Sequence, residues 1–371
     1  MNNVLIASTA HQNSDDMVYY RYARLFRDNG FKVTLVTMQS ELEHDKGITY
    51  LDIPCIKNPI SRMTLLPKYV KKAVLELSEG DIFIYFSIDL NRIAIGASKK
   101  GIKVVKVFAE DYSRKAYSRD WIPCFLRGAI SRYIYKTEIR TSRYCDLNIF
   151  VDSATALYYK CDAINSCVTP NYPIKIQGIY HQQSYEKKKQ LNMVYVGGIS
   201  EIRGIVFILS LAEHLKAKVS IDLYGSISEE GLLDKIKGHP NVHYCGFIPY
   251  DDVLNKLYDY DIGLAIFKPC YAFDYIGENT TKIFEYMQAG LPIITSDVGL
   301  LKDIVVNQTK SGIAIDYSDF EAAYTQIESF LTDQEKLLEC SINGRSEFEN
   351  SRNWDAVSKE LLYRIEGIIN E

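Results

Sequence analysis

Short apolar runs alternate with longer segments of helical periodicity along the chain, and this alternation predicts parallel sheets with crossover helices. The runs in the first half are residues 4–7, 33–37, 82–86, 104–108 and 147–151. Those in the second half are residues 193–196, 219–224, 242–244, 262–267, 292–295 and 313–315. Between the first two runs, residues 19–29 carry apolar side chains on one face and end at Gly30, which predicts a helix with a glycine C-cap.

The alternation pauses between residues 167 and 190, where two prolines precede a polar run, and this break predicts a linker. We therefore expect two Rossmann-like, doubly wound domains over residues 1–170 and 171–353. Residues 354–371 form an amphipathic pattern, and we expect this helix to pack back on the first domain. Sheets of this kind place ligand sites at the carboxyl ends of their strands, which would face a central cleft.

Composition and charge limit the classes of protein to which this chain could belong. Of the 371 residues 47% are hydrophobic and 24% charged, as in ordinary globular proteins, and a net charge of -4 argues against a nucleic-acid partner. The eight cysteines are scattered without metal-ligand spacing, which favours reduced thiols. Residues 1–10 lack the features of a signal peptide, and no run approaches the roughly 20 apolar residues that span a bilayer. We expect a cytoplasmic protein, attached at most to the inner face of the cell membrane.

A glycine-rich segment follows the run at 193–196. Gly197 and Gly198 come first, and Arg203 with Gly204 then opens a helical pattern over residues 205–215. A glycine turn lets the backbone approach a ligand closely, and a helix N-terminus offers free N–H groups and a positive dipole end. These features suit a diphosphate, whose leaving charge Arg203 would neutralise. An ordinary βα turn is the alternative interpretation.

A second candidate segment covers residues 277–292. Asn279 or Thr280 would cap a helix on which Lys282 and Glu285 share one face. The two side chains could simply form an ion pair within the helix. A lysine for phosphate oxygens and a carboxylate for ribose hydroxyls would, however, also suit a nucleotide diphosphate. The tract at 290–292, Gly-Leu-Pro, is expected to stop the helix.

These tracts carry a family resemblance. The segment YVGGISEIRG at 195–204, followed by KIFEYM at 282–287 and GLPII at 290–294, resembles the donor lobe of family-four, or group-one, glycosyltransferases. Members of that family are retaining enzymes of the GT-B fold, often found in polysaccharide and lipopolysaccharide assembly. The resemblance covers essentially the whole chain. It implies an α/β protein of two Rossmann-like domains, with the acceptor in the first and a nucleotide-sugar donor in the second.

The resemblance also implies roles for particular residues. Arg203 stands at the family's phosphate-binding lysine, Glu285 at the second glutamate of its paired-glutamate motif, and Lys282 at a lysine common in a subset. We take these three as the catalytic candidates. The donor-binding candidates are Gly197, Gly198, Gly204, Gly225, Gly277, Glu278, Asn279, Thr280 and Thr281. The acceptor-binding candidates in the first domain are His11, Asp15, Glu110 and Asp111.

Three positions depart from the family pattern. Gly198 replaces an arginine that commonly joins the phosphate clamp, and Ala109 stands where many relatives carry a histidine. Gly277 removes the first glutamate of the pair, so Glu278 or backbone N–H groups would have to handle the donor sugar. The nucleotide end of the expected site therefore follows the family more closely than the sugar end.

The tripeptide Asp259-Tyr260-Asp261 spells D-x-D, a pattern that binds divalent cations in another transferase fold. Polar residues also commonly end a helix before a strand, which is the structural interpretation. Because the resemblance supplies helix dipoles and cations in place of a metal, we expect no metal cofactor.

The segment 114–143 is locally basic, with eight Lys and Arg residues against two acids and with aromatic residues between them. Such a segment could lie on an anionic membrane and receive a lipid-linked acceptor, or it could be a solvated helix face. The basic residues are Arg114, Lys115, Arg119, Arg127, Arg132, Lys136, Arg140 and Arg143, and the acids are Asp120 and Glu138.

The leading functional hypothesis is a retaining glycosyltransferase that acts on a saccharide or lipid-linked saccharide in surface polysaccharide synthesis. No protein nucleophile is implied by the resemblance, so positioning and stabilisation of the leaving charge would dominate catalysis. The alternatives are a nucleotide-sugar epimerase of the same fold, which needs acid/base groups in the site, and a catalytically degenerate partner subunit.

Overall fold

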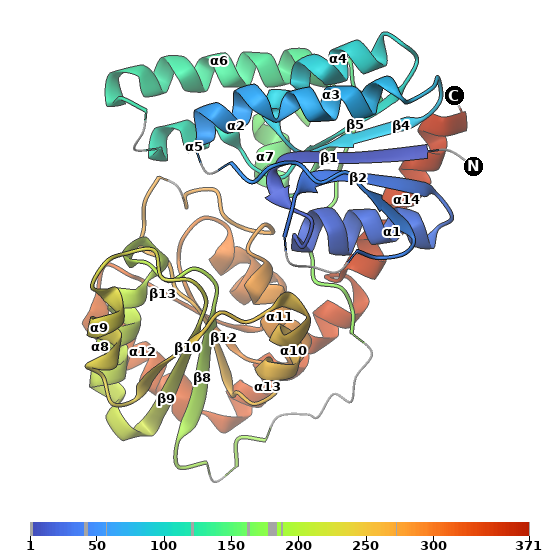
Figure 1. The fold of residues 1–371 in the computed structure, drawn as a ribbon. Coiled ribbons are helices and arrows are strands. Elements are labelled where there is room, and N and C mark those ends of the chain that lie inside the picture. The colour runs from blue at the N-terminus through green and yellow to red at the C-terminus, as the bar shows by residue number, and fades with distance from the viewer. Residues whose placement is uncertain are drawn as a thin grey trace. The chain divides into compact units, whose positions relative to one another are not determined.

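The computed structural model describes residues 3–40, 44–56, 58–119, 122–161, 164–176, 184–186, 188–271 and 273–370. The chain forms two compact units, Met1–Asn171 with Val357–Glu371 and Tyr172–Ala356. Each unit is built on one parallel sheet with helices on both faces (Figure 1). The predicted fold class, two doubly wound parallel sheets, is confirmed.

The first unit carries a sheet in the order β3-β2-β1-β4-β5-β6-β7. All five runs expected from the sequence form strands, but two short edge strands, β3 and β7, were not predicted, because three residues are too few to show a pattern. The strands are β1 (Asn3–Gln12), β2 (Lys32–Met38), β3 (Ile48–Tyr50), β4 (Ile82–Tyr85), β5 (Lys103–Phe108), β6 (Leu147–Phe150) and β7 (Ser166–Val168).

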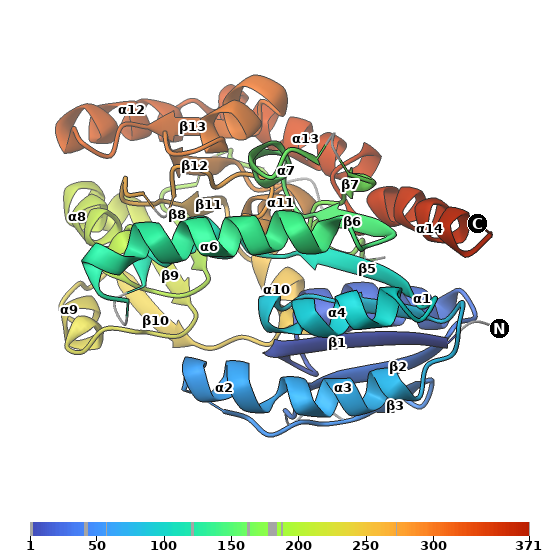
Figure 2. The ribbon, with the colours of Figure 1, turned by 90° about the horizontal axis from the view of Figure 1, so that it is seen from above.

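Helices α3, α4 and α6 cover one face of this sheet and α1 covers the other, as Figures 1 and 2 show. The helices are η1 (Asp16–Ala23), α1 (Arg24–Asp28), α2 (Pro59–Leu65), α3 (Pro67–Leu75), η2 (Ile88–Leu90), α4 (Asn91–Ser98), α5 (Tyr112–Lys115), η3 (Ala116–Ser118), α6 (Cys124–Ser142) and α7 (Ser153–Tyr158). Residues 357–371, most of α14 (Trp354–Asn370), belong to the same unit.

The helix expected at 19–29 is present but begins earlier. Asp15 caps it by accepting hydrogen bonds from the N–H groups of Met17 and Val18. The first eight residues are wound as a π-helix, η1, which continues directly into α1. Gly30 follows with φ of +83°, a conformation that favours glycine at a helix C-terminus.

The second unit carries a sheet in the order β10-β9-β8-β11-β12-β13, and the six runs expected from the sequence supply its six strands. They are β8 (Leu191–Val196), β9 (Val219–Tyr224), β10 (Val242–Gly246), β11 (Ile262–Ala265), β12 (Ile293–Ser296) and β13 (Gly312–Ile315). Every residue of β11 is buried, which explains its continuous apolar run, since a central parallel strand is covered on both faces.

Helices α8, α9 and α12 lie on one face of this second sheet, and α10 and α11 lie on the other (Figure 1). The helices are η5 (Glu201–Arg203), α8 (Ile205–Leu215), η6 (Lys216–Lys218), α9 (Leu232–Lys237), α10 (Tyr250–Leu257), α11 (Thr281–Ala289), η7 (Asp303–Gln308), α12 (Phe320–Thr332) and α13 (Gln334–Asn350). In the part of the chain that the structure describes, no helix has both the length and the apolar character to cross a membrane.

Candidate functional site

The glycine turn at the carboxyl end of β8 is the centre of the candidate donor site. Gly197 has φ of +131°, and its N–H donates to the carbonyl oxygen of Tyr224 over 2.9 Å. A Cβ atom on Gly225 would lie only 1.9 Å from the carbonyl oxygen of Gly197, so the turns after β8 and β9 pack backbone against backbone. No larger residue fits at Gly225 without moving the turn.

Two basic side chains from separate elements converge on this turn. A Cβ atom on Gly197 would lie 2.9 Å from Lys282 Nζ and 3.9 Å from Arg203 Nη1. A Cβ atom on Gly198 would lie 3.1 Å from the same Arg203 nitrogen. The space above the two glycines is therefore occupied by Lys282 from α11 and Arg203 from η5. The structure brings together the predicted residues Gly197, Gly198, Arg203 and Lys282.

The amine of Lys282 has an unusual environment. Its Nζ is buried and has no hydrogen-bond partner among the described residues. It lies 3.8 Å from the centroid of the Tyr195 ring and 5.5 Å from that of Phe267. Burial, reinforced by the charge of Arg203, lowers the pKa of Lys282 well below its usual value, while Glu285 opposes the shift. The ion pair within the helix, considered from the sequence, is not formed.

Helix α11 presents its N-terminal turn to the site. Thr280 occupies the N-cap position and Gly290, with φ of +70°, ends the helix, as predicted. Of the two predicted cap residues, Thr280 therefore holds the N-cap position. The Thr280 side chain makes no capping bond, and the Asn279 side-chain oxygen instead accepts from the N–H of Gly277 over 3.0 Å. The positive end of the helix dipole therefore lies on the turn that carries Lys282.

A buried tyrosine, which sequence reasoning did not single out, fixes α11 against the sheet. The Tyr286 hydroxyl accepts from the N–H of Val196 over 3.1 Å and donates to the carbonyl oxygen of Leu264 over 3.1 Å. A Cβ atom on Gly263 would lie 2.4 Å from the Tyr286 ring, so the glycine in β11 makes room for it. Glycine in a fully buried strand was the available signal, because it often marks a close approach by another group.

A second tyrosine missed at the sequence level braces the turn itself. The Tyr195 hydroxyl donates to the carbonyl oxygen of Gly198 over 2.8 Å, and its ring lies against the Lys282 amine. Burial raises the pKa of Tyr195 to about 12, although Arg203 opposes the shift. The phenol therefore remains a hydrogen-bond donor to the turn at ordinary pH.

The remaining donor-site candidates lie around these groups in different ways. Glu285 is only 7% exposed and lies close enough to Lys282 for their charges to interact. Gly204, with φ of +81°, packs so closely that a Cβ atom would lie 2.7 Å from the Ile266 carbonyl oxygen. Thr281 is the first residue of α11.

Gly277 and Glu278, the two candidates for contact with the donor sugar, each lie close to another side chain. A Cβ atom on Gly277 would lie 3.1 Å from the Leu300 Cβ, so a glutamate there would crowd that side chain. The carboxylate of Glu278 lies beside the Tyr172 hydroxyl, and burial together with this carboxylate raises the pKa of Tyr172 to about 12, with Arg352 opposing. Glu278 therefore faces Tyr172.

Three of the four acceptor candidates gather at the carboxyl edge of the first sheet. His11 Nδ1 lies 2.7 Å from Ser8 Oγ, and the imidazole lies close enough to Asp15 and Glu110 to affect both carboxyl groups. Burial raises the pKa of Asp15, with His11 opposing. Burial also acts to raise the pKa of Glu110, but Lys115, 2.6 Å away, and other cations lower it.

Asp111 does not join that group. It caps α5 by accepting from the Arg114 N–H over 3.0 Å, pairs with the Arg114 guanidinium, and accepts from the Tyr159 hydroxyl over 3.1 Å. Its carboxylate is used to hold the helix in place. The same contact removes Arg114 from the expected basic surface, because the guanidinium is buried.

Further charged residues that sequence reasoning missed lie beside Glu110. Thr9 Oγ1 donates to both carboxylate oxygens of Asp89, over 2.9 and 2.8 Å, and burial raises the pKa of Asp89. Burial also raises the pKa of Tyr112, whose phenol lies near Glu110, Asp89, Arg62 and Arg119. Asp89 comes three residues after the predicted strand at 82–86, a position typical of ligand-binding residues, so a signal was present.

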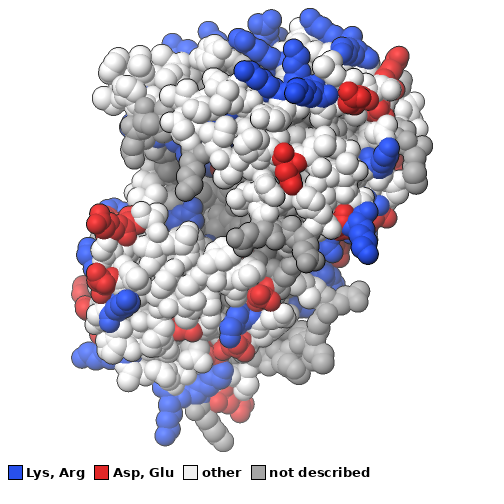
Figure 3. All heavy atoms as spheres, in the orientation of Figure 1, with Lys and Arg blue, Asp and Glu red and all other residues white. Residues whose placement is uncertain are grey.

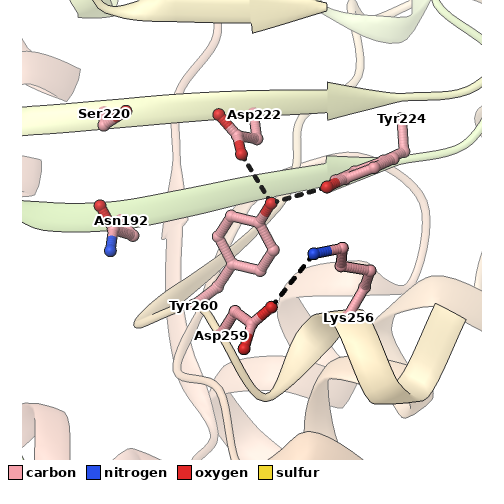
Figure 4. A pocket seen from close by; sticks show the side chains of 7 residues that line it. All are labelled: Asn192, Ser220, Asp222, Tyr224, Lys256, Asp259 and Tyr260. Atoms are coloured by element: carbon pink, nitrogen blue, oxygen red, sulfur yellow. Dashed lines mark hydrogen bonds and ion pairs between the residues drawn. The ribbon is translucent and has the colours of Figure 1, made fainter. Parts of the chain in front are cut away.

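The three side chains of the D-x-D tripeptide each bond to a different partner. Figure 4 shows Asp259 paired with Lys256, at 3.3 Å, and the Tyr260 hydroxyl donating to Asp222 over 2.7 Å. Asp261 accepts from the Asn192 N–H over 2.8 Å and pairs with Lys188. The cavity of about 260 Å³ drawn there is lined mainly by polar side chains, among them Asp222, Lys256 and Asp259. The described residues contain no group of three or more potential metal ligands.

The basic segment is only partly a surface. Exposed cations on α6 are accompanied by Phe125, 81% exposed, and Tyr133, 67% exposed. Figure 3 shows Lys and Arg side chains gathered where α3, α4 and α6 cover the first sheet. Glu138, however, is buried and pairs with Lys106 inside the unit. Asp120 and Trp121 lie outside the described residues.

Comparison with known proteins identifies the fold of the chain and the family of its second half. Residues 177–347 match the family model of glycosyl transferases group 1. Sucrose-phosphate synthase from Thermosynechococcus elongatus is similar over 98% of both chains, with a TM-score of 0.72 and 16% identity. No curated protein matches the sequence significantly.

Two further solved structures share the fold. WaaG, a glycosyltransferase involved in lipopolysaccharide biosynthesis, matches 96% of this chain and 98% of its own, with a TM-score of 0.71 and 14% identity. HepE from Anabaena, in complex with UDP and glucose, matches 99% of this chain and 100% of its own, with a TM-score of 0.72 and 11% identity. Residues 177–347 therefore form a group 1 glycosyl transferase domain, and the two-sheet architecture of the chain is the GT-B fold.

Proposed function

We propose that this enzyme is a retaining glycosyltransferase that builds a surface polysaccharide, such as a capsule, O-antigen or exopolysaccharide. The donor is a nucleotide-diphosphate sugar, and the acceptor is a saccharide or lipid-linked saccharide. One observation carries the proposal: Lys282 and Arg203 converge on the turn at Gly197, beside the N-terminus of α11. Two cations, a helix dipole and bare backbone are what a diphosphate requires.

In the proposed reaction, the acceptor oxygen forms a bond to the anomeric carbon on the face from which the diphosphate leaves. The bond between that carbon and the phosphate oxygen breaks, and the acceptor proton passes to a phosphate oxygen. Arg203 and Lys282 hold the diphosphate, whose charge grows as it departs. Glu285 holds the donor ribose through its carboxylate. No metal is used, since protein cations and the helix dipole stabilise the leaving group, so EDTA should leave transfer unchanged.

We place the acceptor at the group formed by His11, Asp15 and Glu110, with Asp89 beside it. Carboxylates and an imidazole bind and orient hydroxyl groups, which suits a saccharide. The exposed cations and aromatic rings of α6 support contact of this cytoplasmic enzyme with an anionic membrane surface that bears a lipid-linked acceptor. Cosedimentation with vesicles of phosphatidylglycerol, but not of phosphatidylcholine, would test that contact.

The first test of the donor assignment is thermal stability in the presence of UDP, GDP, ADP and TDP. A nucleotide at 100 times its Kd should stabilise the protein by about 2.7 kcal/mol. Arg203→Ala should abolish the shift, whereas Lys336→Ala, on the surface of α13 beside Glu339, should retain it. Absence of a shift with all four nucleotides would favour a degenerate partner subunit.

A further inference from the structure

The Lys282 amine is the only group of the candidate donor site that is buried with no hydrogen-bond partner among the described residues. The residue lies in the first turn of α11, and its nitrogen lies over the backbone of Gly197 rather than in solvent. A buried ammonium without an acceptor costs several kcal/mol relative to water, even after the protein relaxes. Its protonation state therefore depends on which charges and dipoles face it.

The facing groups come from each element packed against the amine. Tyr195 of β8 and Phe267, which follows β11, present ring faces, and stacking of a desolvated cation on such a face contributes about 2 kcal/mol or more. Glu285 of α11 favours the charged amine, whereas Arg203 of η5 disfavours it. The N-terminal end of the α11 dipole is also positive.

These contributions together determine whether the Lys282 amine carries a proton when no ligand is bound. Stacking on the rings and the Glu285 carboxylate do not offset burial, a neighbouring guanidinium and the helix dipole together. The direction of the pKa shift, well below the usual value of lysine, agrees with this balance. Burial without a hydrogen-bond acceptor in the described part of the chain, beside the Arg203 guanidinium, thus favours the uncharged amine when no anion is bound.

We propose that Lys282 is a neutral amine in the empty donor site and takes up one proton from solvent when a nucleotide diphosphate binds. This inference rests on the proposed function and adds a proton to the binding reaction. In that step an N–H bond forms on Lys282 and no bond of the donor breaks. The diphosphate supplies the acceptor oxygens and the negative charge that the empty site lacks.

The proposal explains how the site works without the arginine that Gly198 replaces. Arg203 is a permanent charge, and Lys282 becomes the second charge only after the diphosphate is present. A second permanent cation over the same turn would repel Arg203 in the empty enzyme. Proton uptake makes affinity depend on pH. In the pH range where Lys282 is neutral in the free enzyme and protonated in the complex, the Kd for the nucleotide diphosphate should rise by up to tenfold for each unit by which the pH increases.

Isothermal titration calorimetry tests the proposal with the full chain and the nucleotide diphosphate that gives the largest thermal shift. Titrations at about pH 8, where the terminal phosphate is already ionised, would be run in Hepes, Tricine and Tris, whose ionisation enthalpies differ. The slope of the observed enthalpy against the buffer ionisation enthalpy counts the protons taken up. We expect a slope approaching one for the wild type and for Lys336→Met.

Two substitutions separate the possible outcomes. Lys282→Arg keeps a permanent cation and should bind with a slope near zero. Lys282→Met should bind at least tenfold more weakly, also without proton uptake. Binding by the wild type with a slope near zero, or uptake that persists in Lys282→Arg, would overturn this inference and leave the proposed function standing. Failure of every nucleotide to bind would instead reject the proposed function.

Discussion

Each unit of the molecule, among the residues that the structure describes, contains a lysine with a buried amine, and the two amines differ in their partners. In the first unit, Lys106 of β5 pairs with Glu138 of α6 and donates to Asn91 over 3.1 Å. In the second unit, Lys282 has rings, a guanidinium and a glycine turn around it, and no hydrogen-bond acceptor among the described residues. Both amines are buried but only one has a hydrogen-bonded partner within the described structure, and this difference separates a lysine that holds the fold from one that awaits a ligand.

The energetic consequences follow from the partners. Breaking a buried pair by removing one member leaves a charge without compensation and costs about 3–5 kcal/mol. Removing an unpartnered polar group from a buried position has the opposite sign, because its desolvation penalty disappears. The unpaired lysine therefore lowers the stability of the second unit but leaves a group ready to bind an anion. Functional sites often reduce stability in this way.

The same substitution at the two lysines should consequently change stability in opposite directions. Lys106→Met should lower the free energy of unfolding by about 3–5 kcal/mol, because Glu138 is left buried and unpaired. Lys282→Met should leave it unchanged or raise it by about 1–3 kcal/mol. Urea denaturation followed by circular dichroism measures both values. A loss of similar size in the two variants would contradict the distinction.

A double substitution sharpens this result. Replacing Lys106 by Met and Glu138 by Leu removes both charges and should recover most of the stability lost in Lys106→Met, since apolar packing commonly substitutes for a buried pair. Neither Lys106→Met nor the double variant should alter nucleotide binding, provided that each is assayed below its unfolding transition. Weaker binding in the double variant would mean that the first lysine also serves the ligand.

Catalysis, unlike stability, should be lost when Lys282 or its neighbour Arg203 is replaced. Arg203→Ala, and separately Lys282→Met, should each reduce kcat by about 10²–10³, the usual cost of losing one group that stabilises a leaving charge. Glu285→Ala should also reduce transfer strongly, through lost positioning of the donor. Release of nucleotide diphosphate from UDP-, GDP-, ADP- and TDP-sugars in the presence of acceptor provides the measurement. Near-normal transfer by folded Arg203→Ala and Glu285→Ala variants would reject the site.

Much of the fold was predictable because long, central strands have their own signal. All four residues of β11 are buried, and an apolar run of that kind is expected where helices cover both faces. The edge strands Ile48–Tyr50 and Ser166–Val168 were not predicted, because only their neighbours in the sheet give them a strand conformation. Local pattern and tertiary context therefore account for different parts of the same sheet.

The candidate site divides in the same way. Gly197, Arg203 and Lys282 were found from a glycine turn and a helix start, both local features. The orientation of Asp111 toward Arg114 and Tyr159 could not be read locally, since those partners are set by the packing of α5. The missing acceptor for the Lys282 amine was equally invisible, because an absent contact leaves no trace in a sequence.

The positioning of α11 should be separable from its charge. Tyr286→Phe removes a hydroxyl that joins α11 to β8 and β11, leaving the Val196 N–H and the Leu264 carbonyl oxygen without this partner. We expect a loss of about 1–3 kcal/mol in stability, and weaker donor binding because Lys282 is less well placed. Tyr286→Phe should still take up a proton on binding, because Lys282 is unchanged. Its Kd for the nucleotide diphosphate should nevertheless rise several-fold. An unchanged Kd would show that the hydroxyl serves stability alone.

The smallest expected effect compares two neighbouring carboxylates of the first unit. Glu110 faces His11 and the cations Lys115 and Arg119, whereas Asp111 caps α5. Glu110→Gln should raise the KM for acceptor about fivefold, corresponding to about 1 kcal/mol of lost hydrogen bonding, with stability unchanged. Asp111→Asn should lower stability and leave the KM for acceptor within twofold. Initial rates at saturating donor, with acceptor varied, measure the first effect, and thermal unfolding measures the second. If Asp111→Asn raised KM more than Glu110→Gln did, the acceptor would contact the residue that the fold already uses, and the assignment of the two roles would be reversed.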